Sequence, residues 1–145
     1  MKINLYKQVS SVPVSLPLVK KVVQAALPSR YRTGQVNIFF VTAQEIKKLN
    51  QLYRHKNSAT DVLSFPLISS EKFILPPQEP RELGDIFICP AVAARQVKEF
   101  NQTLRTEIIF LLIHGLLHLI GYDHIKISDR QRMEKMQNKI LLKIK

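Results

Sequence analysis

Short stretches rich in β-branched and aromatic residues, the first of them alternating with polar residues, predict four β-strands along the chain. We assign these strands to residues 3–9, 36–41, 61–65 and 84–89. Pro66 closes the third strand, since a proline cannot donate a ladder hydrogen bond. Pro76, Pro77 and Pro80 predict a loop before the fourth strand, and we expect the strands on either side of this loop to pair as in a hairpin.

Apolar residues recur at helical spacing in five other stretches. We assign helices to residues 16–27, 43–53, 90–101, 104–120 and 129–144. Thr42 and Thr103 are the expected N-cap residues of the second and fourth helices, and Glu45 completes a capping box with Thr42. Ser128 is expected to start the last helix, with Gln131 at the corresponding capping-box position.

Strands and helices follow one another in the order β-α-β-α-β-β-α-α-α, which is typical of the α+β class. The longest apolar run, residues 108–120, is too short to span a bilayer and predicts a buried helix. We therefore expect a single domain, residues 1–145, in which one mixed sheet of about four strands packs with helices around this buried helix.

Two histidines lie on the predicted buried helix. His114 and His118 are four residues apart and project from the same helix face, so both can reach one metal ion. Gly121 is a common helix stop, and the turn there lets His124 supply a third nitrogen. Three neutral imidazoles with a water in the fourth position describe a catalytic zinc site, with one Zn²⁺ per chain. A structural site usually has four protein ligands that include cysteine, and Cys89 is the only cysteine.

The alternative to a metal site is a set of histidines buried for packing alone. Two histidines four apart can arise by coincidence, but three of the four histidines in the chain fall within residues 114–124. In the usual zinc-protease helix, a glutamate follows the first histidine and acts as general base. Gly115 holds that position here, which argues against an ordinary metalloprotease and leaves the general base unassigned.

The formal net charge of +11 is concentrated at the two ends of the chain. Residues 1–43 hold six Lys or Arg and no acid, residues 126–145 hold seven bases and two acids, and the stretch between is neutral. Basic ends fit a polyanion such as RNA, although a solubilising surface is the alternative. Residues 1–6 contain no signal core, and with a single cysteine we expect a cytoplasmic protein without a membrane partner.

Three sequence blocks resemble one known family. Residues 114–124 have the letters HGLLHLIGYDH, which are similar to the HGxLHLxGYDH signature of the YbeY family of bacterial ribosomal-RNA maturation factors. Tyr53-Arg54 followed by residues 60–66 (TDVLSFP) resembles the family's second block, and residues 83–86 (LGDI) resemble its third. Order and spacing agree, so the resemblance covers roughly residues 36–136.

This resemblance implies an α+β fold and a zinc-dependent, single-strand-specific endoribonuclease. The family is described as acting in the 3′-end maturation of small-subunit (16S) ribosomal RNA and in ribosome quality control. The implied partners are ribosomal RNA and the small ribosomal subunit, together with a ribosome-assembly GTPase and small-subunit proteins. Carried over, His114, His118 and His124 become the zinc ligands, with His114 also counted as catalytic, and Arg54 becomes a catalytic or RNA-binding arginine.

Five polar residues near the motifs have candidate roles. Arg54 is either a helix-end cation or a guanidinium that clamps a phosphate, and the block match favours the clamp. His55 and Lys56 follow it, and we expect both to contact RNA. Asp85 is either a turn residue or an acceptor that orients a ligand histidine or the metal's water, and both readings stay open. Asp123 is expected to order the ligand loop through backbone amides.

Stacking on unpaired bases has few candidate residues, because the chain has four tyrosines and no tryptophan. Tyr53 and Tyr122 lie nearest the motifs, and core packing is the default expectation for both.

Three functions remain as hypotheses from the sequence. The first is a metal-dependent endoribonuclease. The second is a ribosome-assembly and RNA-binding factor that contains zinc and has little nuclease activity. The third is a peptidase or another small-substrate metallohydrolase, against which both Gly115 and the net charge of +11 count.

Overall fold

A computed structural model describes residues 1–67, 82–100 and 102–144, except the side chain of residue 100. The loop predicted around Pro76, Pro77 and Pro80 lies outside these residues. Among the described helices, none is both long and apolar enough to cross a membrane.

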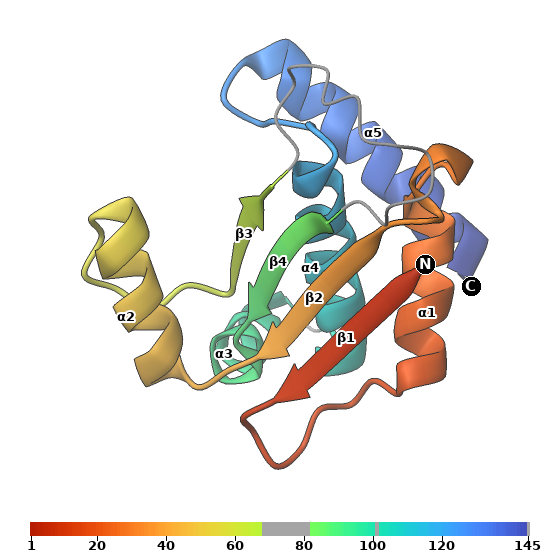
Figure 1. Ribbon diagram of the computed structural model, residues 1–145. Coiled ribbons are helices and arrows are strands. Elements are labelled where there is room, and N and C mark those ends of the chain that lie inside the picture. The colour runs from red at the N-terminus through yellow and green to blue at the C-terminus, as the bar shows by residue number, and fades with distance from the viewer. Residues whose placement is uncertain (68–81, 101, 145) are drawn as a thin grey trace.

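The four described strands form one mixed sheet (Figure 1). They are β1 (Lys2–Lys7), β2 (Gln35–Phe40), β3 (Val62–Pro66) and β4 (Glu82–Ile88), in the spatial order β1-β2-β4-β3. β1 and β4 both run parallel to β2, whereas β3 is antiparallel to β4 and forms one edge of the sheet, opposite β1. The hairpin-like pairing of β3 with β4 and the mixed four-stranded sheet are thus confirmed.

Five α-helices complete the described fold. They are α1 (Leu16–Ala26), α2 (Ala43–Arg54), α3 (Pro90–Phe100), α4 (Leu104–Leu119) and α5 (Ile127–Ile144), with a 3₁₀ turn at Ser29–Tyr31. Two of the three predicted caps are confirmed, because Thr42 Oγ1 accepts from the Glu45 amide at 3.2 Å and Thr103 Oγ1 accepts from the Thr106 amide at 3.2 Å.

The start of α5 differs from the prediction. The helix begins at Ile127, so Ser128 lies inside its first turn rather than before it. The reason is that the carbonyl of Lys126 already accepts a hydrogen bond from the Arg130 amide at 2.9 Å. Lys126 therefore occupies the place of the N-cap, and the capping role expected of Ser128 is wrong.

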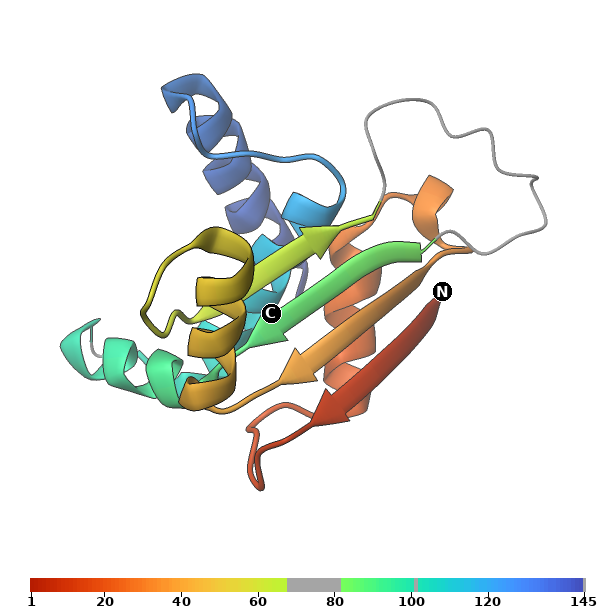
Figure 2. The ribbon, with the colours of Figure 1, turned by 60° about the vertical axis from the view of Figure 1, so that its left-hand side comes forward.

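Helix α4 lies behind the sheet in the view of Figure 1, with α1 beside it on the same face, as Figures 1 and 2 show from two sides. It packs against β3 and β4 on one side and against α1, α3 and α5 elsewhere. Ile86 from the sheet and Leu112 and Leu116 from α4 are among the residues that meet in this core with no more than 1 % exposure. The expectation of a buried histidine-bearing helix in an α+β domain is confirmed.

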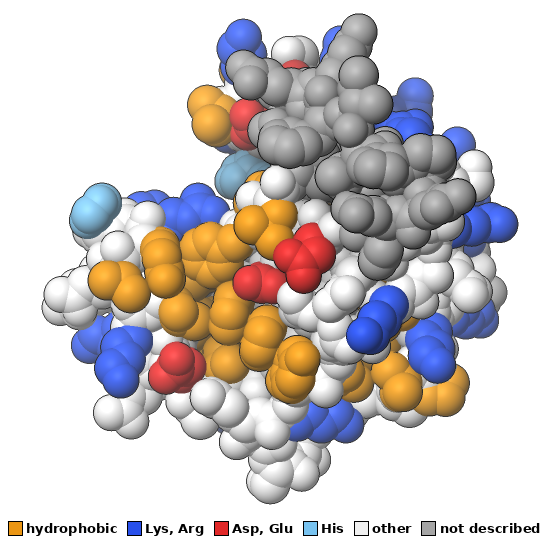
Figure 3. All heavy atoms as spheres, viewed as in Figure 1, with side chains coloured by type: hydrophobic (Ala, Val, Ile, Leu, Met, Phe, Trp, Pro, Cys, Tyr) orange, Lys and Arg blue, Asp and Glu red, His pale blue; other side chains and the backbone are white. Residues whose placement is uncertain are grey.

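The other face of the sheet carries a row of aromatic rings. Tyr6 stacks on Phe39 at 4.8 Å between ring centroids, and Phe39 stacks on Phe87 at 4.5 Å. Phe65 meets Phe87 edge-on at 5.7 Å, and Tyr53 meets Phe65 edge-on at 5.2 Å. Hydrophobic side chains gather at the centre of this face, with Lys and Arg around its border (Figure 3). Tyr53 is 59 % exposed, so its expected core packing is wrong, whereas Tyr122 packs partly buried against the core.

Candidate metal centre

The end of α4 reverses the chain towards its own histidines. Gly121 adopts a φ of 105°, which a residue with a Cβ rarely reaches. Its amide donates to the carbonyl of His118 at 3.1 Å, and the Tyr122 amide donates to the carbonyl of Leu117 at 3.0 Å. This pair of bonds is the Schellman motif, and it starts the turn that returns His124 to the helix face. The turn predicted at Gly121 is therefore present.

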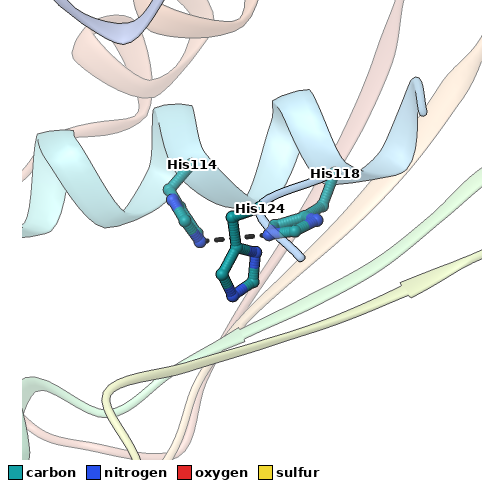
Figure 4. A group of neighbouring side chains, drawn as sticks. All are labelled: His114, His118 and His124. Carbon is teal, nitrogen blue, oxygen red and sulfur yellow. Dashed lines mark hydrogen bonds between the residues drawn. The ribbon is translucent and has the colours of Figure 1, made fainter. Parts of the chain in front are cut away.

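The three predicted ligands converge on one point. His114 and His118 project from the same side of α4, and His124 comes back from the following segment to meet them (Figure 4). The Nε2 atoms of His114 and His118 are 3.1 Å apart, and one nitrogen from each ring lies within 4.8 Å of the other two. Nitrogens bound to one tetrahedral zinc at about 2.1 Å would be about 3.4 Å apart, and this distance lies between the two observed values. The three histidines can therefore hold a metal ion.

The loop that carries His124 is fixed by the residue before it. Asp123 Oδ1 accepts a hydrogen bond of 2.8 Å from the Ile125 amide. This is the backbone-ordering contact that was expected of Asp123. The third ligand is exposed, in contrast to the half-buried His114 and His118, so the centre is open to solvent on the His124 side.

Burial keeps the two helical imidazoles neutral. Burial first, then the neighbouring His118 and His124, lower the pKa of His114 to about 4. The pKa of His118 is also lowered, first by burial and then by His124, and Asp123 and a backbone hydrogen bond at Tyr122 oppose this shift. Metal binding requires neutral imidazole, so both rings are in the protonation state of a ligand at neutral pH.

Gly115 lies where α4 meets the sheet. A Cβ at this position would lie 2.8 Å from Ile86 Cγ2 and 3.2 Å from Ser64 Oγ, both in the sheet. Gly115 therefore allows α4 to pack closely on β3 and β4. A glutamate at this position would have no room, so the general base of the zinc-protease helix is excluded here sterically as well as by sequence.

A further residue of the centre escaped the sequence analysis. Gln137 of α5 is 3 % exposed, and its side-chain nitrogen lies 2.6 Å from His114 Nδ1. Its position in the sequence could have revealed this residue, because Gln137 comes four residues after Met133 and three residues before Ile140. Those two residues form the buried stripe of α5, so Gln137 is a polar side chain on an apolar helix face.

Arg54 ends α2 next to the edge strand and the histidines. Its Nη2 donates a hydrogen bond of 3.0 Å to the carbonyl of Ser64 in β3, and its guanidinium carbon lies 5.8 Å from the centre of the Phe65 ring. The positive charge is also close enough to His118 to contribute, as the smallest cause, to the lowered pKa of that histidine. The structure thus brings Arg54 to the metal centre.

Asp85 lies away from the metal centre. Its Oδ1 accepts a hydrogen bond of 2.9 Å from Asn37 Nδ2, and Asn37 Oδ1 in turn accepts one of 2.9 Å from Asn4 Nδ2. The next residue, Ile86, faces Gly115 of α4, and successive strand side chains point to opposite faces. Asp85 therefore belongs to the aromatic face of the sheet, and it orients neither a ligand histidine nor the metal's water.

His55 and Lys56 follow Arg54 on the surface. His55 caps α2 in the left-handed conformation, with a φ of 57°, and both side chains are exposed. Their contact with RNA stays a prediction.

Two hollows lie near the chain reversal after α4. One of about 220 Å³ is bordered by His114 and His124, and its lining includes both Arg130 and Glu134. The other is formed by the reversal itself, and its lining includes Arg132 together with Asp123 and Asp129. The charges in both linings are therefore mixed.

The fold and the site together define an α+β protein with a three-histidine centre able to bind a metal ion. Residues 6–145 match the sequence model of the family described as "Endoribonuclease YbeY". The chain belongs to the YbeY family of endoribonucleases, as the resemblance of the three sequence blocks had indicated.

Individual relatives agree with this assignment. The chain is 45 % identical over 108 residues to an endoribonuclease YbeY of Macrococcus caseolyticus, covering 74 % of this chain and 70 % of the relative. It is 44 % identical over 110 residues to that of Finegoldia magna, covering 76 % and 69 %. A solution structure of a Thermotoga maritima protein superposes with a TM-score of 0.67 and 29 % identity, covering 98 % of this chain and 88 % of the other.

Proposed function

We propose that this protein is a zinc-dependent, single-strand-specific endoribonuclease that acts in 3′-end maturation of small-subunit ribosomal RNA and in ribosome quality control. The observation that carries the proposal is the convergence of His114, His118 and His124 beside the guanidinium of Arg54. Family membership supports the nuclease activity. We propose that it works in the cytoplasm with ribosomal RNA, the small subunit and its proteins, and a ribosome-assembly GTPase.

The donor set favours zinc as the metal. Among the described residues, the cluster offers three imidazole nitrogens and no cysteine or carboxylate, which leaves a coordination position open, as is typical of catalytic rather than structural zinc. Bound there, zinc would act as a Lewis acid on a phosphodiester oxygen and activate water at neutral pH. The protein itself contributes the neutral imidazoles, their fixed orientation and the positive charge of Arg54.

Arg54 favours RNA over an extended peptide as the substrate. A peptide that adds to an edge strand needs the outward carbonyl and amide groups of that strand. The guanidinium of Arg54 already occupies the carbonyl of Ser64 in the edge strand β3. Its remaining N–H donors suit phosphate oxygens, which arginine binds in a bidentate manner. We infer that Arg54 binds the phosphate next to the cleaved bond and stabilises its charge in the transition state.

The experiment that tests this function compares wild type with His118→Ala and His55→Ala. Bound zinc is quantified, and the 3′ ends of small-subunit ribosomal RNA are mapped in cells that carry each variant. His118→Ala should lose zinc and leave unprocessed 3′ ends, whereas His55→Ala removes a histidine outside the cluster and should keep its zinc. Normal 3′ ends with the metal-free His118→Ala protein would favour the alternative, an RNA-binding assembly factor with little nuclease activity.

A further inference from the structure

Gln137 contacts one of the predicted metal ligands, His114. Its side chain reaches from α5 to His114 Nδ1 at 2.6 Å, on the ring edge away from His118 and His124. The opposite nitrogen of the same ring, Nε2, lies 3.1 Å from His118 Nε2 and points into the cluster. Nε2 is therefore the atom of His114 that would bind the metal, and Nδ1 is the atom that forms the hydrogen bond with Gln137.

The two ring nitrogens cannot be treated independently. A neutral imidazole carries one proton, so Nε2 has a lone pair for a metal only when the proton is on Nδ1. With the amide nitrogen of Gln137 towards the ring, Nδ1 must accept, and the proton then sits on Nε2 and blocks a metal. A half-turn of the amide exchanges its nitrogen for its oxygen, and Nδ1–H can then donate to Oε1.

We propose that Gln137 is a positioning residue that prepares His114 for metal binding by accepting the Nδ1–H hydrogen bond through its amide oxygen. The contact of 2.6 Å accommodates either orientation of the amide, and the orientation with its oxygen towards Nδ1 is the one that leaves Nε2 free for a metal. The proposal rests on the metal centre of the proposed function and adds to it a partner that selects the tautomer of one ligand.

Burial makes this contact selective. Gln137 is 3 % exposed, so water does not compete freely for its amide, and its neighbours Met133 and Ile140 on the same helix face are each 1 % exposed. A polar side chain in such a place needs a hydrogen-bond partner to offset its lost hydration. Glutamine also stays uncharged, so it can fill this position with or without a metal ion.

Two substitutions distinguish a hydrogen-bonding role of Gln137 from a role in packing alone. Gln137→Met keeps the length of the side chain and removes every hydrogen bond. Gln137→Glu keeps an acceptor and, when ionised, holds Nδ1 in the donor form. Ile140→Val is the matched control, because it trims a buried side chain of the same helix face without touching His114.

The first measurement is zinc affinity, by competition with a chelator on the intact protein. Gln137→Met should bind zinc about 10- to 100-fold more weakly than wild type, the range found when such a supporting partner is removed. Gln137→Glu should bind at least as tightly as wild type, and Ile140→Val should be unchanged. Affinity of Gln137→Met within about twofold of wild type, or equal losses in Gln137→Met and Gln137→Glu, would overturn the proposal.

The second measurement does not require zinc or activity. Long-range ¹⁵N–¹H NMR on metal-free protein reports which nitrogen of His114 carries the proton. Gln137→Glu should hold the proton on Nδ1, whereas Gln137→Met should not. The same tautomer in both variants would refute the positioning role even if the protein proved to be a zinc nuclease. A wild type that binds no zinc would instead count against the proposed function.

Discussion

Arg54 Nη2 donates a hydrogen bond of 3.0 Å to the carbonyl oxygen of Ser64. Ser64 is in the edge strand β3, and its hydroxyl faces Gly115, between the two helical histidines of α4. One side chain therefore fixes the end of α2 to the strand that lies on the histidine helix. This link explains how a residue far from the histidine motif in sequence can have a constant position relative to the metal centre.

Removing the guanidinium should impair catalysis more than folding. We expect Arg54→Lys and Arg54→Met to lower kcat/KM for single-stranded RNA by about 10²-fold, the cost of losing one donor that stabilises transition-state charge. Lysine keeps a charge, but it cannot bond Ser64 and a phosphate in the same planar arrangement. Because Arg54 is exposed and its hydrogen bond to Ser64 is only partly buried, the free energy of unfolding should fall by about 1 kcal/mol.

The control for this prediction is Lys48→Met, which removes an exposed cation from the same helix. Cleavage of a labelled single-stranded RNA and urea unfolding are measured for all three variants. An equal loss of activity in Lys48→Met would mean that Arg54 acts only through general attraction of the polyanion.

Acid should destabilise the metal-free protein through its histidines. The pKa of His114 is about 4 in the folded chain, against an ordinary value of 6.5, and that of His118 is lowered too. The unfolded chain therefore binds protons first. This linkage has no effect above about pH 6.5 and removes stability progressively as the pH falls towards about 4.

Urea midpoints of metal-free protein across this pH range test the effect. His114→Gln removes a ring whose pKa is strongly lowered by folding, so the stability of this variant should decline less steeply with acid than that of wild type. Parallel curves for the two proteins would show that carboxylates, rather than His114, govern the acid response.

The order of the elements could be predicted because each element is encoded locally. Thr42 and Thr103 mark helix starts by capping chemistry, and Gly121 marks a helix end by its left-handed conformation. The candidate metal site was also local, since His114 and His118 need only helical spacing and His124 only a turn. Such features depend on neighbours within about one or two turns of the chain.

The features that could not be predicted depend on which face of an element is covered. β4 has apolar residues on both faces, because Ile86 points towards α4 and Phe87 belongs to the aromatic row. The alternation of side chains along the strand therefore could not predict which face carries Asp85. Tyr53 is 59 % exposed although its ring meets Phe65 at the end of the aromatic row. The role of Gln137 could not be predicted, because its contact with His114 depends on how α5 packs against α4 and joins residues far apart in sequence.

Adding one methyl group at Gly115 should disturb the contact between α4 and the sheet. Gly115→Ala places a Cβ 2.8 Å from Ile86 Cγ2, and overpacking of this kind costs about 1–3 kcal/mol. Alanine regains about 1 kcal/mol of helix propensity, so we expect a net loss of up to about 2 kcal/mol. Thermal unfolding of Gly115→Ala, Ile86→Ala and the double variant Gly115→Ala/Ile86→Ala measures the coupling, which should be favourable because the second change makes room. Additive losses would contradict the steric explanation.

His55 offers a test in which stability and RNA contact respond differently. Its φ of 57° is left-handed, which costs a residue with a Cβ about 1 kcal/mol or more, whereas glycine adopts it freely. We expect His55→Gly to raise the free energy of unfolding by about 0.5 kcal/mol after the extra chain entropy of glycine, and His55→Ala to give no gain. Both variants lack the imidazole, so binding of single-stranded RNA should weaken equally in both. Thermal unfolding and RNA titration are measured together: a less stable His55→Gly would refute the conformational argument, and unchanged binding in both variants would refute the RNA contact.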